Sequence, residues 1–203
     1  MKPIIERMSL PELIIYVSKF MFERDLIDLA GGNTSAKDGD IIYMTPTLAG
    51  NAFHWDLGVE DLVTGSLAKV DELICHPKFS REGLTHLAIY KTYPFVNAII
   101  HAHPFYILPF TAASKPIPPV LNASKVFGTL QYHGEAPAYS QKQADLIVEM
   151  LDDKQEVMQK KAAAVLMPRH GIIVAGCDLI TVLDCLQRMH TNAFAVLAQK
   201  WLA

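Results

Sequence analysis

The sequence predicts an α/β protein in which helices pack on a central mixed sheet. Two observations point to this class. Apolar residues recur at helical spacing in some segments, and in others they form short continuous runs suited to buried strands. The two kinds of segment interleave along the chain, but without the strict strand–helix–strand period of a doubly wound protein. No repeat, low-complexity tract or Gly/Ser-rich linker divides the sequence, so we expect one domain over residues 1–203.

The N-terminal part is expected to hold one long helix, a turn and short strands. The helix is predicted to begin behind Ser9, because Ser9 and Glu12 form an S-x-x-E capping box ahead of an apolar stripe. Residues 31–35, Gly-Gly-Asn-Thr-Ser, break the helical pattern and are expected to form a turn. A short strand is expected at residues 41–44, and residues 67–70 are compatible with another.

The rest of the chain is predicted to continue the alternation of helices and strands. Asp178 is a good N-cap, so the last helix is expected to begin behind it and to run to about residue 202. Residues 104–140 are rich in Pro, Gly and Ala and are expected to be irregular, with a short helix near 106–113. The other helices are expected over 82–93 and 141–151, and the other strands over 96–102, 162–167 and 171–175.

Composition excludes several classes of function. The formal net charge of -3 argues against a nucleic-acid partner, and no apolar run is long enough to span a membrane. The three cysteines show no C-x-x-C spacing and are expected to be reduced thiols in a cytoplasmic protein. Hydrophobic residues make up 51% of the chain and charged residues only 19%. A surface so poor in charge indicates that partner subunits cover part of it.

Three of the eight histidines stand apart by their position. His101 and His103 lie two residues apart at the end of an apolar strand, so alternation turns both to the same face. His170 lies in a tight connection that ends in Gly171. Three histidines without an obvious fourth protein ligand are typical of a catalytic metal site with an open position. Taken singly, the pair is also compatible with polar groups at a strand end, and His170 with a turn residue.

Glu82 is the candidate acid or base. It lies at the start of a predicted helix, four residues before His86, so the two side chains share one helix face. One interpretation is a surface carboxylate that caps the helix. The other is a general acid/base whose pKa is set by burial and by a nearby metal. His86 is expected to be structural or to support the site from behind, and not to be a ligand.

Turns rich in hydroxyl and backbone N–H groups suggest an anion site. Such donors, with an arginine fork among them, suit a phosphate, although each turn taken singly is also compatible with an ordinary turn. The candidate phosphate-binding residues are Gly32, Asn33, Ser35, Thr45, Thr47, Ser80 and Arg81.

The order of these motifs resembles the class II aldolase/adducin family, which includes the fuculose-phosphate aldolases. The resemblance covers nearly the whole chain and rests on five motifs in the family's order. They are G-N-x-S (Gly32, Asn33, Ser35), T-P-S/T (Thr45, Pro46, Thr47), S-x-E-x-x-x-H (Ser80, Glu82, His86), H-x-H (His101, His103) and H-G (His170, Gly171).

The resemblance implies a three-layer α/β/α fold with a central mixed, largely antiparallel sheet, and a homotetramer with active sites between subunits. It also implies one Zn²⁺, or another divalent metal, per subunit on His101, His103 and His170. The metal would stabilise an enediolate of a small phosphorylated ketose as a Lewis acid, and Glu82 would transfer the proton. The implied activity is that of a metal-dependent aldehyde-lyase.

Departures from the family's pattern leave the substrate and reaction open. Leu48 stands where family aldolases often have glycine, and Arg81 where phosphate aldolases commonly have serine, so the anion is a phosphate or a carboxylate. Glu82 speaks against the epimerase branch, which tends to carry aspartate. A dehydratase acting on a ketose phosphate is the first alternative, and a non-catalytic adducin-like interaction module is the second. The source of a catalytic tyrosine, which some family aldolases use, is also open.

Overall fold

A six-stranded sheet forms the centre of the molecule, with strand order β3-β2-β1-β4-β6-β5. The computed structural model describes residues 7–132 and 134–202. All five pairings between these strands are antiparallel, where a mixed and largely antiparallel sheet was expected. The strands are β1 (Asn33–Asp38), β2 (Ile41–Met44), β3 (Val63–Ser66), β4 (Ala98–Ala102), β5 (Ala162–Met167) and β6 (Gly171–Gly176).

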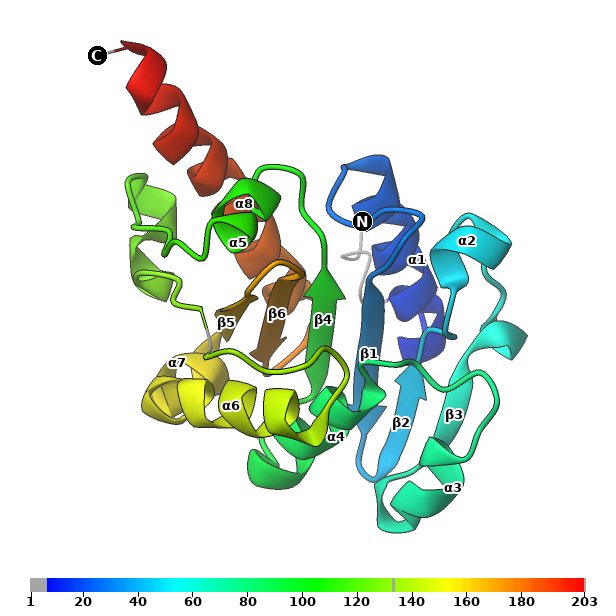
Figure 1. Cartoon of the computed structure of the whole chain (residues 1–203). Helices are drawn as coiled ribbons and strands as arrows, with labels where there is room; N and C mark the ends of the chain where they lie inside the picture. Colours follow the sequence, from blue (N-terminus) through cyan, green and yellow to red (C-terminus); the bar gives the residue numbers. More distant parts are fainter. Residues whose placement is uncertain (1–6, 133, 203) are drawn as a thin grey trace.

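Helices cover both faces of this sheet (Figure 1). The long helices α1 (Leu10–Glu23) and α8 (Leu179–Leu202) pack on one face. The other face is covered mainly by α4 (Gly83–Thr92), α6 (Gln141–Leu151) and α7 (Gln155–Lys160). The remaining short helices are α2 (Ala49–Phe53), α3 (Val70–Ile74), α5 (Leu108–Ala112) and the 3₁₀ turns η2 (Val59–Asp61), η3 (Leu67–Lys69), η4 (Asn122–Phe127) and η5 (Asp152–Lys154).

Strand β4 contributes to a separate apolar core on each face. Ile100 packs in the core under α1 and α8, whereas Ile99 packs in the core under α4 and α6. Successive side chains of a strand point to opposite faces, so a strand covered on both sides must be apolar throughout. This explains why β4, β5 and β6 are visible in the sequence as continuous apolar runs.

The predicted helix starts are confirmed at both long helices. The backbone N–H of Ser9 donates to Glu12 Oε2 at 2.7 Å, as a capping box requires. Asp178 Oδ1 accepts the backbone N–H of Thr181 at 2.8 Å, so it caps α8 as expected. None of the described helices is both long and apolar enough to cross a membrane.

Two local predictions are wrong. Residues 33–35 are not part of a turn but begin β1, because β1 hydrogen-bonds to β2 on one side and β4 on the other, and this pairing overrides the local turn preference. Residues 67–70 are not a strand either. The strand is β3, and the Ser66 side chain accepts the backbone N–H of Ala68, which starts a 3₁₀ turn at the strand's end.

Candidate active site

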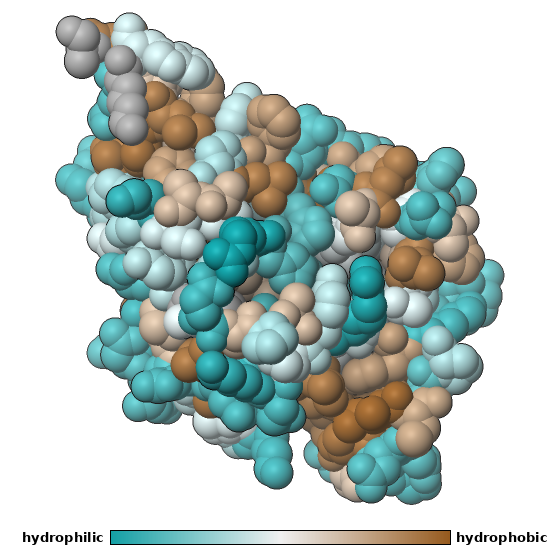
Figure 2. Space-filling view, viewed as in Figure 1, coloured by the Kyte–Doolittle hydropathy of each residue, from teal (hydrophilic) through white to brown (hydrophobic). Residues whose placement is uncertain are grey.

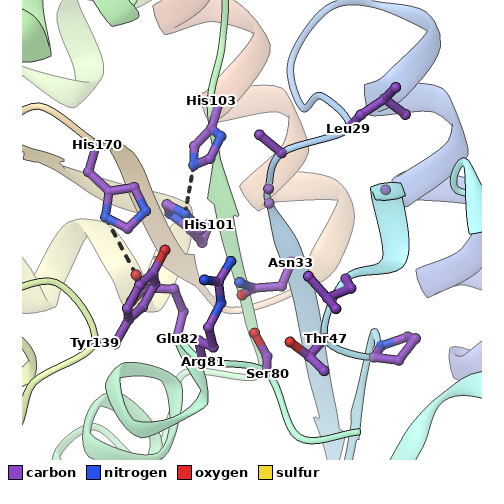
Figure 3. Close-up of a pocket in the computed structure, with 16 residues that line it drawn as sticks. Leu29, Asn33, Thr47, Ser80, Arg81, Glu82, His101, His103, Tyr139 and His170 are labelled. Carbon is purple, nitrogen blue, oxygen red and sulfur yellow. Dashed lines mark hydrogen bonds and ion pairs between the residues drawn. The ribbon is translucent and has the colours of Figure 1, made fainter. Parts of the chain in front are cut away.

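A pocket at one end of the sheet collects most of the predicted site residues (Figure 3). Its walls come from segments far apart in the sequence: the loop before β1, the N-terminal ends of α2 and α4, the end of β4 and the β5–β6 turn. It is lined by Leu29, Ala30, Gly31, Gly32, Asn33, Pro46, Thr47, Leu48, Gly50, Ser80, Arg81, Glu82, His101, His103, Tyr139 and His170.

The three candidate ligand histidines lie together in this pocket. One ring nitrogen of each of His101, His103 and His170 lies within 4.8 Å of the others. His101 lies in β4, His103 follows its last residue, and His170 lies in the β5–β6 turn beside them. Strand alternation, as expected, brings the first two to the same face.

The hydrogen bonds of the two β4 histidines define which ring nitrogens face the pocket. His101 Nδ1 lies 3.1 Å from the carbonyl oxygen of Ile172, which can only accept, so Nδ1 carries the proton. His103 Nδ1 lies 3.4 Å from Asp28 Oδ1, a carboxylate oxygen that also accepts. A ring that carries only its Nδ1 proton presents the lone pair of its Nε2 atom, and the two Nε2 atoms are 3.1 Å apart.

Two lone pairs at this distance repel each other unless a cation lies between them. Zinc binds imidazole nitrogen at about 2.0–2.1 Å, so two nitrogens of a tetrahedral site lie about 3.3 Å apart. Burial, and then the neighbouring rings of His103 and His170, hold the pKa of His101 well below its ordinary value, so this ring is neutral and competent as a ligand. The donor set therefore fits a divalent metal.

Glu82 lies at the N-cap position of α4 with only 2% of its surface exposed, which excludes the surface-carboxylate interpretation. Its Oε1 atom is 3.5 Å from His170 Nδ1, and Thr85 Oγ1 lies 3.4 Å from Oε2. Burial raises the pKa of Glu82 to about 7, against the opposing effects of the Thr85 hydroxyl and the Arg81 charge. A carboxyl group with such a pKa can hold or release a proton near neutral pH.

Two of the predicted phosphate-binding side chains lie elsewhere. Ser35 Oγ is buried 2.7 Å from His86 Nδ1 and 2.9 Å from the hydroxyl of Tyr90, and it does not line the pocket. Thr45 Oγ1 accepts the backbone N–H of Thr34 at 3.0 Å and is also fully buried. The Ser35 hydroxyl thus joins β1 to α4, the Thr45 hydroxyl bonds to the backbone of β1, and neither side chain lines the pocket in which the other predicted anion-binding residues lie.

His86 is fully buried behind the site and lies outside the ligand cluster, as expected. Burial lowers the pKa of His86 to about 3, so it remains neutral at physiological pH. Its contact with Ser35 joins α4 to β1, the elements that carry Glu82 and Asn33.

The other five predicted anion-binding residues line the pocket, namely Gly32, Asn33, Thr47, Ser80 and Arg81. Asn33 is 4% exposed, and its Oδ1 atom has no hydrogen-bond partner among the described residues. A buried polar atom left without a partner is costly, so this amide is suited to a bound ligand.

Tyr139 also lines the pocket, although no sequence motif pointed to it. The centroid of its ring is 5.5 Å from that of His170, and the Arg81 guanidinium lies 4.7 Å from the centre of the same ring (Figure 3). Tyr139 precedes α6 with a positive φ of 65°, in the segment expected to be irregular. Its approach depends on the path of that segment, which periodicity does not predict.

The family model described as the Class II Aldolase and Adducin N-terminal domain matches residues 12–196 of the chain. The chain belongs to this family. An L-fuculose phosphate aldolase of Methanococcus maripaludis is 29% identical over 173 residues, which cover 85% of this chain and 87% of the relative. A 3-oxo-tetronate 4-phosphate decarboxylase of Haemophilus influenzae is 27% identical over 193 residues, covering 90% and 84%.

Solved structures support the same fold for this class II aldolase family member. An L-fuculose 1-phosphate aldolase superposes with a TM-score of 0.76 at 20% identity, covering 95% of this chain and 87% of the other. The L-fuculose-1-phosphate aldolase of Thermus thermophilus gives a TM-score of 0.74 at 18% identity, covering 95% of each chain. The family match and the aldolase relatives identify the chain as an enzyme of the lyase class, and they leave its substrate undetermined. Its histidine group could hold a metal ion.

Proposed function

We propose that this class II aldolase family member is a metal-dependent aldehyde-lyase that cleaves a small phosphorylated ketose by retro-aldol chemistry. The observation that carries the proposal is the pair of His Nε2 atoms 3.1 Å apart, beside a buried carboxyl group in the same pocket. A non-catalytic, adducin-like module has no need of such a ligand set and acid together. We also propose that residues 1–203 form one domain of the family and that the protein works in the cytoplasm.

His101, His103 and His170 would hold one Zn²⁺, or another divalent metal, per subunit. Bound there, the metal would supply Lewis-acid charge to the substrate carbonyl group. The rings are suited to this role because burial keeps His101 neutral and Nδ1 contacts orient both His101 and His103.

Glu82 would move the proton. In a retro-aldol cleavage, the substrate hydroxyl group loses a proton and becomes the carbonyl of the released aldehyde. The electron pair of the broken carbon–carbon bond passes to the ketone fragment, which then takes up a proton on carbon. The position of Glu82 in the pocket wall and its pKa of about 7 support this role.

Asn33, Thr47, Ser80 and Arg81, with the backbone at Gly32, would bind the phosphate. Asn33 and Gly32 both line the pocket, and the Asn33 side-chain amide would donate an N–H group to a phosphate oxygen. Arg81 contributes the charge and the forked N–H groups that phosphate recognition uses. Both relatives described above are named for phosphorylated compounds, which supports a phosphate over a simple carboxylate.

A decarboxylase is the second candidate, because one relative carries that name. Loss of carbon dioxide beside a ketone leaves the same electron pair on the ketone fragment, so the same metal and acid would serve. A dehydratase would instead expel water and release no aldehyde.

A substrate panel tests these candidates. Metal-loaded protein is incubated with ketose 1-phosphates, their unphosphorylated forms and a 3-oxo sugar-acid phosphate, and aldehyde, carbon dioxide and dehydrated ketone are each measured. We expect aldehyde from a ketose phosphate, and no turnover in His103→Ala, which should also lose most of its metal. A wild-type protein that binds no divalent metal, or that acts on none of these compounds when loaded, would overturn the proposal.

We further propose a homotetramer, which would cover apolar surface on the projecting end of α8. Figure 1 shows this end extending away from the sheet, and Figure 2 shows hydrophobic surface over it. Trp201 is 76% exposed and Phe194 is also exposed, and residues 116–126 are a second candidate contact. Light scattering should give about four times the chain mass of 22.5 kDa, and a stable, active monomer would refute the assembly.

A further inference from the structure

Asp28 lies in the loop before β1, outside every motif that pointed to the site. Its Oδ1 atom accepts the backbone N–H groups of Ala30 at 2.9 Å and Gly31 at 2.8 Å, which closes a tight turn. The same oxygen lies 3.4 Å from Nδ1 of His103, on the ring edge opposite the Nε2 atom that faces His101.

Backbone contacts fix both ends of this pair. The carbonyl oxygen of Asp28 accepts the indole N–H of the buried Trp55 at 2.9 Å. On the other side, the backbone N–H of His103 donates to the carbonyl oxygen of Leu26 at 3.1 Å. The first contact therefore holds the Asp28 loop against Trp55, and the second joins this loop to the end of β4.

Two glycines leave the space that the His103 ring occupies. A Cβ atom added at Gly31 would overlap the Cε1 atom of the ring, and one added at Gly171 would lie 2.8 Å from Cδ2. The position of the ring is thus defined by its neighbours. The remaining freedom is which nitrogen carries the proton, and this depends on the partner of Nδ1.

We infer that Asp28 is a positioning residue of the metal site, acting through His103. A carboxylate that accepts the Nδ1 proton holds the tautomer in which Nε2 is free, and it raises the basicity of that nitrogen. His101 has only the neutral carbonyl of Ile172 in the equivalent place, so the two ligands of β4 are tuned differently. The inference deepens the proposed function and rests on it.

Metal affinity of Asp28→Asn and Asp28→Ala tests the inference. Zn²⁺ dissociation constants are measured by competition with a chromophoric chelator, and Co²⁺ is added to record its visible spectrum. We expect Asp28→Ala to bind zinc about 10- to 100-fold more weakly, the range found when partners of metal ligands are removed. Asp28→Asn keeps an oxygen acceptor for the turn but loses the charge, so its affinity should fall between that of Asp28→Ala and the wild type.

A second measurement separates positioning from general damage to the loop. In metal-free protein, ¹⁵N NMR should show the His103 proton on Nδ1 in the wild type and a mixture of tautomers in Asp28→Ala. Asp25→Asn removes a carboxylate three residues earlier in the same segment and should change neither zinc affinity nor tautomer.

Unchanged zinc affinity and an unchanged tautomer in Asp28→Asn and Asp28→Ala would overturn the inference. If Asp28→Ala does not fold, Asp28→Asn decides alone, because its amide oxygen preserves the turn. A wild-type protein without zinc affinity would instead refute the proposed function, so the two failures are distinguishable.

Discussion

The two walls of the pocket are built differently. The proposed metal wall (His101, His103, His170 and Glu82) is anchored in regular elements: His101 is buried in β4, Glu82 is buried at the start of α4, and one polar atom of each is hydrogen-bonded to a neighbour. The proposed anion wall (Gly32, Asn33, Thr47, Ser80 and Arg81) combines buried residues such as Asn33 of β1 with loop residues, where Arg81 is exposed and the neighbouring Leu48 is 55% exposed. Rigid elements hold reacting groups accurately, whereas loops tolerate change. The chemistry of this lyase should therefore be robust, and its substrate choice should reside in the anion wall.

The largest expected effect tests the metal wall. Glu82→Gln keeps the shape of the side chain but removes the proton transfer, so kcat should fall by roughly 10² to 10⁴. Metal content and the circular dichroism spectrum should match the wild type. Turnover close to the wild-type value on a true substrate would assign the proton transfer to another group.

Arg81→Ala tests the anion wall. Loss of a hydrogen bond to a charged group costs about 1.5–3 kcal/mol, so KM for a phosphorylated substrate should rise roughly ten- to a hundredfold. Inorganic phosphate should compete with the substrate in the wild type and much less in the variant. Arg81→Lys serves as the control that keeps the charge without the fork. If KM is unchanged, the anion is bound elsewhere.

Ser35→Ala tests whether Ser35 stabilises the fold or belongs to the anion wall. It leaves the buried partners His86 and Tyr90 without their shared hydroxyl, so the free energy of unfolding should fall by about 1–3 kcal/mol, measured by urea denaturation. KM should stay at the wild-type value, because the side chain does not line the pocket. A raised KM with unchanged stability would return Ser35 to the anion site.

The buried, neutral His86 behind the pocket makes the fold sensitive to acid. Burial lowers the pKa of His86 in the folded chain to about 3, whereas its ordinary value in the unfolded chain is 6.5. At pH values between these two, the unfolded chain binds a proton that the folded chain does not. Stability from this group is complete above pH 6.5 and is lost as the pH falls towards 3, by about 1.4 kcal/mol between pH 7.5 and 5.5. Urea midpoints of metal-free protein measure the slope, which His86→Asn should reduce. An equal slope in the variant would contradict this.

The smallest expected effect lies in the anion wall. Leu48 has a positive φ of 59° directly after Thr47, a conformation that costs a residue with a Cβ atom about 1–2 kcal/mol. Leu48→Gly should remove this strain, although glycine also adds an entropy cost on folding. The free energy of unfolding should therefore rise by a net amount of about 0.5–1 kcal/mol. A lower melting temperature would mean that the Leu48 side chain makes contacts that outweigh the strain.

Sequence patterns predicted the metal wall better than the anion wall, for a physical reason. Strand alternation alone turns His101 and His103 to one face, and a capping position places Glu82 at a helix start. The hydroxyls of Ser35 and Thr45 fit a binding turn and a buried structural bond equally well, and only the pairing of β1 with its neighbours decides between them.

Asp28 and Tyr139 could not be predicted at all, although both lie at the pocket. Asp28 reaches His103 because a loop crosses the end of β4, and Tyr139 reaches His170 along an irregular segment. Such approaches depend on tertiary path and not on local period. The alternation of helices and strands fits several topologies, so it could not predict the strand order of the antiparallel sheet.

The register of β4 has a consequence for how the protein reaches its native state. His101 is paired with Asn33 of β1 on one side and Ile173 of β6 on the other, and a slip of one residue would send its ring into the opposite core. Only the correctly paired sheet can assemble the ligand set. A metal at a thousand times its dissociation constant would stabilise that pairing by about 4 kcal/mol. The ion would therefore also favour the correct register of β4 over slipped registers.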